Sequence, residues 1–292
     1  MAADRLLVGA LTAPVDRADL PPRTSRELGM ELAGWLIVSL LSWLFFGAIA
    51  LGLSFVPPRP WWALLPAGIA TVITLGLLRS AVRPNPAYRV RLVRLGRFAA
   101  ANGMTFTPRP DAPHTGPGLI FNQGSQPTTR EVVRMDEPRE IELGMHHFGY
   151  GRSTTHASDW AYATTPISDQ QLPHLVLRAR GKWTDTNLPG SDDESLGTPE
   201  LEGPGAEAYL VTAPIGRTGT VGPLLDATLF RPDVLARLTE RPVHVEVVDG
   251  RLYLYRRESL VTEDPDTWRW ILELVGDVAA ALEDPATAEP GN

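Results

Sequence analysis

The chain has 292 residues, of which 43% are hydrophobic and 21% charged, and its formal net charge is −7. It contains no cysteine, which excludes thiol nucleophiles, disulfides, iron–sulfur clusters and zinc sites with cysteine ligands. Lys182 is the single lysine and is followed by Trp183, so the chain lacks a G-x-x-x-x-G-K-[ST] phosphate loop. Most enzyme classes that short motifs identify are therefore excluded.

Two long apolar runs dominate the N-terminal third. Residues 32–58 and residues 60–78 contain no charged side chain. A bilayer core about 30 Å thick needs about 20 apolar helical residues. The segments 33–56 and 61–78 supply 24 and 18 such residues, so the pattern predicts two transmembrane helices.

The segment between the two runs is Pro57-Pro58-Arg59-Pro60, which ends both helices because proline lacks an N–H donor. We expect a transmembrane hairpin over residues 32–79, preceded by a cytosolic tail over residues 1–31. Arginines on the flanks outnumber the one in the turn by nine to one: Arg17, Arg23, Arg26, Arg79, Arg83, Arg89, Arg91, Arg94 and Arg97. Since positive charge marks the cytoplasmic side, we expect a multi-pass inner-membrane protein with both termini in the cytoplasm. Small residues at four-residue spacing in the spans are typical of a close helix contact, either within the hairpin or between copies in a homo-oligomer. The alternative is chance use of alanine and glycine in GC-rich coding.

A helix is predicted after the hairpin, with Asn85-Pro86 at its start and Gly103 at its end. One side of this helix is apolar, and the other carries Arg91, Arg94 and Arg97. The basic side has two interpretations. It contacts anionic lipid headgroups at the membrane surface, worth about 1 kcal/mol per arginine, or it is an ordinary solvated face.

Beyond this helix the hydrophobic pattern alternates with period two, as is typical of strands. The predicted strands are residues 104–107, 130–135, 140–148, 160–165, 174–180, 208–213, 243–248 and 252–256. Asp249-Gly250 between the last two predicts a tight hairpin, and residues 231–240 predict a short helix before it. Asp264-Pro265 begins a final amphipathic helix. We expect an α+β fold with a mostly antiparallel, β-rich cytosolic domain over residues 80–284 and a disordered tail over residues 285–292.

The predicted cytosolic part is acidic. Residues 80–292 carry 21 basic and 29 acidic side chains, a net charge of −8, which argues against nucleic acid as a partner. Seven acidic residues and no basic one lie between Lys182 and Arg217: Asp185, Asp192, Asp193, Glu194, Glu200, Glu202 and Glu207. With the glycines and prolines among them, they predict a flexible acidic loop over residues 184–207. A calcium site is the alternative, because oxygen ligands are plentiful.

The densest group of candidate metal ligands is His146, His147, His156 and Asp159. Neighbouring residues of a strand point to opposite faces, so His146 and His147 are not expected to share one site. No motif spacing supports a metal ion or a general base here. We therefore assign no catalytic, cofactor-binding or metal-binding residue from the sequence. His174 is expected as a polar position in a buried strand.

Several short sequence segments, taken in their order along the chain, carry a resemblance to a group of proteins. They are the helix Tyr88–Gly103, the strand phrases Glu142-Leu143-Gly144 and Leu172–Leu177, and Arg231-Pro232-Asp233 before the last hairpin and helix. In this order the chain resembles uncharacterised actinobacterial membrane proteins. The resemblance implies an N-terminal hairpin that anchors a cytosolic α+β domain of unknown function, and it implies no catalytic residues.

Together these features predict a membrane-anchored interaction or regulatory module that is not an enzyme and needs no cofactor. Its expected partners are the lipid bilayer and an unidentified protein. Two alternatives stay open. One is a pleckstrin-like domain that responds to anionic lipids through Arg91, Arg94 and Arg97. The other is a metal-assisted hydrolase that uses histidines of the group at residues 146–159.

Overall fold

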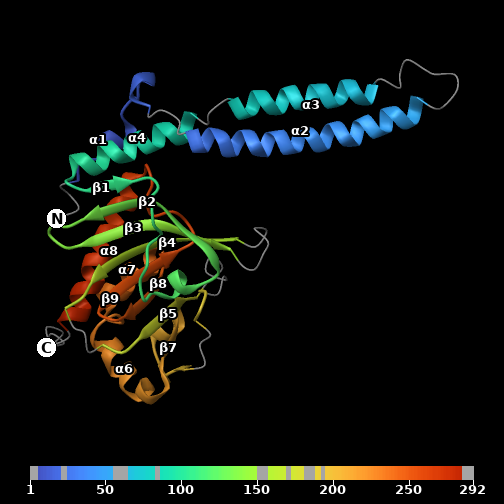
Figure 1. Ribbon diagram of the computed structural model, residues 1–292. Coiled ribbons are helices and arrows are strands. Elements are labelled where there is room, and N and C mark those ends of the chain that lie inside the picture. Colours follow the sequence, from blue (N-terminus) through green and yellow to red (C-terminus); the bar gives the residue numbers. More distant parts are fainter. Residues whose placement is uncertain are drawn as a thin grey trace. The chain divides into compact units, whose positions relative to one another are not determined.

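The computed structural model describes residues 6–20, 25–54, 65–82, 86–149, 157–168, 172–180, 188–191 and 195–284 (Figure 1). The chain divides into two compact units. The smaller unit is Val15–Val93, and the larger unit combines Met1–Pro14 with Arg94–Asn292.

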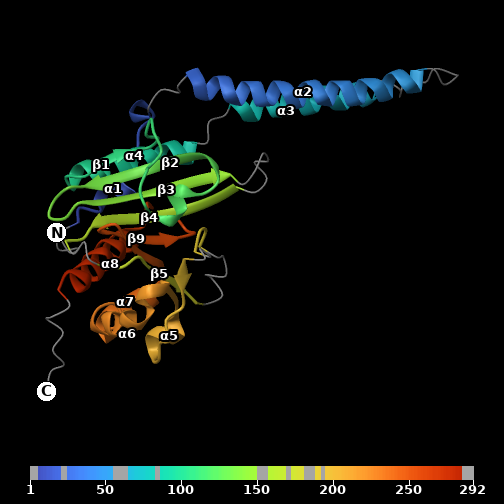
Figure 2. The ribbon, with the colours of Figure 1, turned by 60° about the horizontal axis from the view of Figure 1, so that its bottom comes forward.

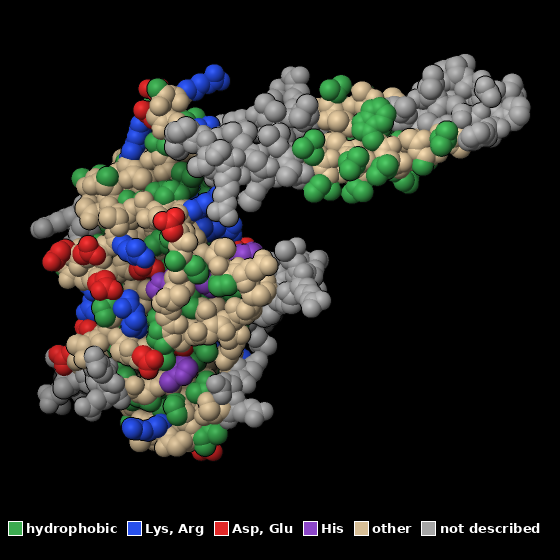
Figure 3. Space-filling view, viewed as in Figure 1, with side chains coloured by type: hydrophobic (Ala, Val, Ile, Leu, Met, Phe, Trp, Pro, Cys, Tyr) green, Lys and Arg blue, Asp and Glu red, His purple; other side chains and the backbone are tan. Residues whose placement is uncertain are grey.

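The smaller unit contains two long helices. α2 spans Ser25–Ser54 and α3 spans Leu65–Val82, and they lie side by side in both views (Figures 1 and 2). A 3₁₀ turn, η2 at Arg17–Asp19, precedes them in the chain. Large apolar side chains are exposed along the helix pair (Figure 3): Leu36, Ile37, Val38, Leu40, Leu41, Trp43, Leu44, Phe45, Ile49, Leu51, Ile69, Val72, Ile73 and Leu75.

The predicted transmembrane hairpin is wrong. Among the residues that the structure describes, no helix combines the length and the apolar character needed to cross a membrane. Hydropathy alone did not locate the helix ends. α3 begins at Leu65 and includes Arg79, so its apolar part is shorter than the roughly 20 residues of a span. α2 includes Arg26, Glu27 and Glu31 in its first two turns. The predicted multi-pass location in the inner membrane depended on this hairpin and is corrected with it.

The larger unit is built on an antiparallel sheet. Within the described residues, nine strands follow the order β1-β2-β3-β4-β9-β8-β5-β7-β6, and all neighbours are antiparallel. Their bounds are β1 Thr105–Thr107, β2 Ser125–Met135, β3 Ile141–Gly149, β4 Ala157–Pro166, β5 Leu175–Ala179, β6 Leu196–Gly197, β7 Tyr209–Pro214, β8 His244–Val248 and β9 Arg251–Arg256. Asp249 and Gly250 have φ angles of 49° and 70°, which confirms the predicted tight hairpin.

Helices bury one face of this sheet (Figure 2). The helical elements of the larger unit are α1 Gly9–Thr12, α4 Pro86–Ala101, α5 Pro204–Ala208, η6 Ile215–Arg217, α6 Thr218–Ala227, α7 Pro232–Glu240 and α8 Pro265–Glu283, with α4 beginning in the smaller unit. Phe98 of α4 and Trp268 of α8 join the same core as Leu143 of β3. The side chain of Asp264 caps α8 by accepting hydrogen bonds from two backbone N–H groups. The β-rich α+β character and the three helices predicted outside the hairpin, which are α4, α7 and α8, are confirmed.

The N-terminal segment packs against α4. Leu6 and Leu11 are buried in the helix-side core. The backbone N–H of Leu7 donates to Asn102 Oδ1 at 2.8 Å, and Arg94 Nε donates to the carbonyl of Ala13 at 3.0 Å. Residues within the expected N-terminal tail therefore contribute to the core of the larger unit.

The other face of the sheet is covered by residues 108–124, which we call the strap. It contains the 3₁₀ turn η4 at Leu119–Asn122. Ile120 and Phe121 of this turn pack on a second, largely aromatic cluster. The strand residues of that cluster are Phe148, Trp160, Tyr162, Val176, Tyr253 and Tyr255. Because strand side chains alternate, this aromatic layer and the helix-side core lie on opposite faces of the sheet.

Candidate functional site

Two buried glutamates lie beneath the strap. Glu142 of β3 is 8% exposed and Glu246 of β8 is fully buried. The strand register places them in one row across β3, β4, β9 and β8, with Thr164 and Tyr253 between them. Carboxylates are rarely buried unless they are paired or hydrogen-bonded, so the partners of these two define the site.

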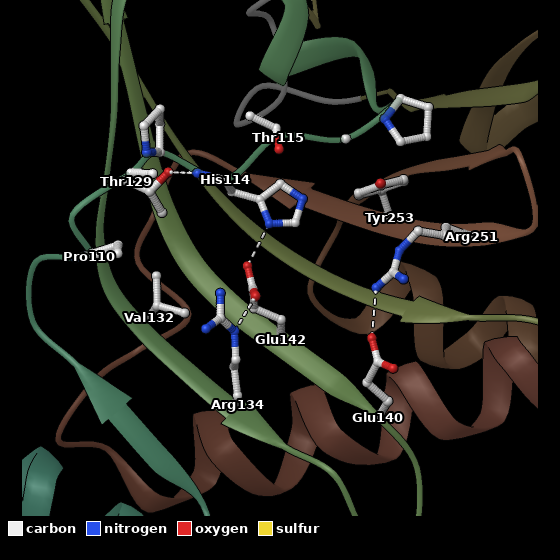
Figure 4. Close-up of a pocket in the computed structure, with 14 residues that line it drawn as sticks. Pro110, His114, Thr115, Thr129, Val132, Arg134, Glu140, Glu142, Arg251 and Tyr253 are labelled. Carbon is white, nitrogen blue, oxygen red and sulfur yellow. Dashed lines mark hydrogen bonds and ion pairs between the residues drawn. The ribbon is translucent and has the colours of Figure 1, made fainter.

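Glu142 accepts hydrogen bonds from three side chains. Its Oε1 atom lies 2.6 Å from His114 Nδ1, and its Oε2 atom lies 2.6 Å from Arg134 Nε (Figure 4). Oε1 also accepts from the hydroxyl of Tyr162 at 2.6 Å. Burial alone would raise the pKa of Glu142, but these three hydrogen bonds outweigh it and lower the pKa to about 2. The carboxylate is therefore ionised, and His114 carries a proton on Nδ1.

Glu246 repeats this arrangement at the other end of the row. Its Oε2 atom accepts from the backbone N–H of Leu119 at 2.8 Å and from the hydroxyl of Tyr255 at 2.6 Å. Its Oε1 atom lies 2.8 Å from His174 Nε2. Burial, followed by the charge of Glu246, raises the pKa of Tyr255, which keeps its hydroxyl a donor. Each glutamate thus binds one tyrosine and one histidine. The strap group is His114 itself at Glu142, where Arg134 is the third partner, and the backbone N–H of Leu119 at Glu246.

The strap approaches the sheet closely between these two anchors. The backbone N–H of His114 donates to Thr129 Oγ1 at 2.7 Å. A Cβ atom on Gly116 would lie 2.7 Å from the hydroxyl of Tyr253 and 3.0 Å from His114 Nε2. The first distance is shorter than real Cβ atoms show, so any larger residue at this position would force Tyr253 or the strap to shift.

A pocket of about 440 Å³ opens between the strap and the sheet. Residues 110–117 of the strap form one wall, and side chains from β2, β3 and β9 form the others (Figure 4). Its polar lining residues are His114, Thr115, Thr129, Arg134, Glu140, Glu142, Arg251 and Tyr253. On one side of the pocket Arg251 Nη2 donates to Glu140 Oε1 at 3.2 Å (Figure 4).

One ring atom in the pocket wall has no partner. In the described part of the chain, His114 Nε2 is buried and makes no hydrogen bond. Buried polar atoms are almost always satisfied by protein, water or ligand. Because Nδ1 donates to Glu142, Nε2 is left in the pocket wall as an acceptor that no described group satisfies.

The histidines singled out in the sequence do not form one site. His146 is fully buried on the strap side, with Nδ1 3.3 Å from Thr129 Oγ1, and burial lowers its pKa to about 4. His147 lies on the opposite face, with Nδ1 3.0 Å from Asp159 Oδ1. The predicted separation of these two neighbours is confirmed. His156 lies outside the described residues.

Within the residues that the structure describes, no group of three or more histidine or acidic side chains could hold a metal ion. Asp159 instead accepts a hydrogen bond from Arg130 Nη2 at 2.8 Å. His174, expected as a polar position of a buried strand, lies just before β5 and binds Glu246. The described residues therefore offer no ligand set for the metal-assisted hydrolase alternative.

The three arginines with a predicted membrane-surface role lie on α4. Arg94 Nη1 forms an ion pair with Glu263 Oε1 at 2.9 Å, and Arg97 Nη1 donates to the carbonyl of Pro14 at 3.2 Å. Arg94 and Arg97 therefore bind other segments of the chain. The contact of Arg91, Arg94 and Arg97 with lipid stays a prediction.

The described part of the predicted acidic loop has some regular structure, because β6 and all but the last residue of α5 fall within residues 184–207. Leu188, also in this segment, is buried in the aromatic cluster beneath the strap. The predicted tail, residues 285–292, lies outside the described residues.

No protein-family model matches the chain, and no curated protein matches it significantly. Among solved structures, it is similar to the crystal structure of the mycobacterial trehalose monomycolate transport factor A, TtfA. The identity is 11%, the TM-score is 0.44, and the match covers 69% of this chain and 97% of that one. A likeness of this strength carries no information about function.

The sequence did contain a signal for the two buried glutamates. In Ile141-Glu142-Leu143 and Val245-Glu246-Val247, a lone carboxylate interrupts an apolar strand. Such a residue is costly to bury unless a partner neutralises it. A proline-rich segment with one histidine, residues 108–118, was available to supply that partner.

Proposed function

We propose that this protein is a non-catalytic binding module, and that its ligand is a small polar molecule held between the strap and the sheet. The observation that carries the proposal is the pocket of about 440 Å³ with the unpartnered His114 Nε2 in its wall. Pockets for small molecules are typically concave, largely preformed and equipped with a few fixed polar groups.

The pocket is preformed because the strap is fastened on both sides of it. His114 is fixed through its backbone N–H and its ring, and Leu119 is fixed through its backbone N–H. Phe121 adds packing, with its ring centroid 5.0 Å from that of Tyr162. Such preorganisation lowers the entropic cost of binding a ligand.

The state of Glu142 supports binding over catalysis. General acid–base catalysis works best when the pKa of the group lies near the working pH. The pKa of Glu142 is about 2, so this carboxylate does not exchange a proton near neutral pH. Its role is to fix the ring of His114 and the guanidinium of Arg134.

The test is a thermal-unfolding screen of the full-length protein against small polar compounds of four kinds: anionic, cationic, zwitterionic and neutral. Thr115 is exposed at the pocket wall, and Thr115→Trp would fill the space. Thr220 on α6 is an exposed threonine outside the pocket, so Thr220→Trp is the matched control.

At least one kind of compound is expected to raise the unfolding temperature of the wild-type protein and of Thr220→Trp, and to leave Thr115→Trp unchanged. If no compound of any kind raises the unfolding temperature, or if Thr115→Trp responds like the wild type, the proposed function is wrong.

A further inference from the structure

Resting on the proposed binding function, we infer that the pocket beneath the strap recognises a small oxyanion, a phosphate or carboxylate group, through Arg134 and Arg251. Both side chains line the pocket, and they come from different strands, β2 and β9 (Figure 4). The inference depends on which of their nitrogens are already used.

In the part of the chain that the structure describes, one of the three guanidinium nitrogens of Arg134 is hydrogen-bonded, and the two terminal nitrogens are not. Its Nε atom donates to Glu142 Oε2 at 2.6 Å, which orients the planar group. Within the described residues, its two terminal nitrogens make no hydrogen bond, and its side chain is 55% exposed. A guanidinium with both terminal nitrogens available matches the two oxygens of a carboxylate or phosphate.

Arg251 stands on the other side of the opening. Its Nη2 atom donates to Glu140 Oε1 at 3.2 Å and its Nε atom to Thr164 Oγ1 at 3.4 Å. In the described part of the chain, Nη1 makes no hydrogen bond. The two guanidinium groups therefore present three unused cationic N–H nitrogens to the same pocket.

The two glutamates of the pocket do not cancel this preference. Glu142 is buried and already accepts from three donors, so little of its charge faces the opening. The side chain of Glu140 is 57% exposed, and water screens a carboxylate in that position. The charged hydrogen-bonding groups left over in the pocket are thus the guanidinium nitrogens, and a ligand oxyanion complements them.

The test is isothermal titration of the full-length protein with glycerol 3-phosphate, inorganic phosphate and glycerol. Glycerol 3-phosphate is expected to bind, inorganic phosphate to bind more weakly, and glycerol not to bind at the same concentrations. Arg134→Gln removes the two terminal guanidinium nitrogens but keeps an amide donor for Glu142. It should raise the Kd of glycerol 3-phosphate by about tenfold or more.

Arg269 is the matched control, since it also forms one ion pair, with Asp266 at 2.7 Å, but lies on α8. Arg269→Gln should leave the Kd unchanged. Arg251→Gln should also weaken the binding of glycerol 3-phosphate. If Arg134→Gln does not fold, Arg251→Gln alone tests the inference.

Glycerol and Thr115→Trp distinguish a failure of the oxyanion inference from a failure of the proposed binding function. Equal binding of glycerol and glycerol 3-phosphate, abolished by Thr115→Trp, would overturn the oxyanion inference and leave the binding function standing. Binding of glycerol 3-phosphate that ignores both arginine variants would also overturn the inference. Absence of binding by every kind of compound in the thermal screen contradicts the binding function itself.

Discussion

Glu142 and Glu246 occupy one row of the sheet, and each carboxylate anchors a different part of the same strap. Glu142 lies 2.6 Å from the ring of His114, and Glu246 accepts from the backbone of Leu119 at 2.8 Å. A tyrosine hydroxyl donates to each of them at 2.6 Å. These two buried carboxylates therefore hold the strap over the sheet.

Neutralising either glutamate is expected to destabilise the protein. Glu142→Gln and Glu246→Gln each replace a buried acceptor by a group that cannot satisfy the same donors, at a cost of about 3 kcal/mol. Glu258 is the control, because its ion pair with Arg256 is largely exposed, and Glu258→Gln should cost less than about 1 kcal/mol. Urea unfolding of the three variants at pH 7 checks this, and equal losses in all three would contradict it.

The contribution of Glu142 should disappear in acid. Its pKa is about 2 in the folded protein against an ordinary value of 4.5, so folding favours the ionised form. That stabilisation is complete above pH 4.5 and is lost as the pH falls toward 2. The difference between the two values corresponds to about 3 kcal/mol.

The measurement compares the free energy of unfolding of the wild type and of Glu142→Gln from pH 7 to pH 3. Both proteins keep His146 and His244, whose burial lowers their pKa values to about 4, so the acid sensitivity of the histidines cancels in the difference. The difference should stay constant above pH 5 and shrink below pH 4.5. A difference that does not change with pH would show that Glu142 gains nothing from ionisation.

Two glycine substitutions are expected to change the free energy of unfolding in opposite directions. Gly116→Ala places a methyl group 2.7 Å from the hydroxyl of Tyr253 and should destabilise by about 1–3 kcal/mol. Gly276 lies inside α8, and a Cβ there would meet nothing within 4 Å. Gly276→Ala should therefore stabilise by about 1 kcal/mol, the difference in helix propensity. Thermal unfolding of both variants checks the signs, and a neutral Gly116→Ala would contradict the close approach of the strap.

The N-terminal segment is expected to matter for stability. Leu11 is fully buried in the helix-side core, whereas Leu7, four residues earlier, is 60% exposed. Leu11→Ala should cost about 2–5 kcal/mol, and Leu7→Ala should cost less than about 0.5 kcal/mol. Chemical denaturation of the two variants provides the comparison. Similar small losses would mean that the segment does not share the core.

Local patterns predicted the parts of the fold that local physics determines. The Asp249-Gly250 turn, the capped start of α8 at Asp264 and the amphipathic helix α4 each follow from a few neighbouring residues. The predicted transmembrane hairpin is wrong because hydropathy does not show where helices begin and end: α2 takes in Glu27 and Glu31, and α3 begins only at Leu65 and takes in Arg79.

The site depends on pairs that are distant in the sequence. His114 and Glu142 are 28 residues apart, and Leu119 and Glu246 are 127 residues apart. Only the order of the strands brings these groups together, and no spacing rule predicts that order. The proline-rich strap has no periodic pattern, so its position over the sheet was not foreseen. The alternation that separates His146 from His147 was predictable because it depends on one strand alone.

The central claim is that the pocket beneath the strap binds a small anionic ligand. Backbone amide chemical shifts of the full-length protein during titration with glycerol 3-phosphate test it most directly. The largest changes are expected at Thr115, Arg134 and Arg251. A second pocket offers a rival location, and it is lined by Arg231 just before α7, Arg237 on α7 and Asp277 on α8. Changes confined to that second pocket, or binding without any change in the strap, would contradict the claim.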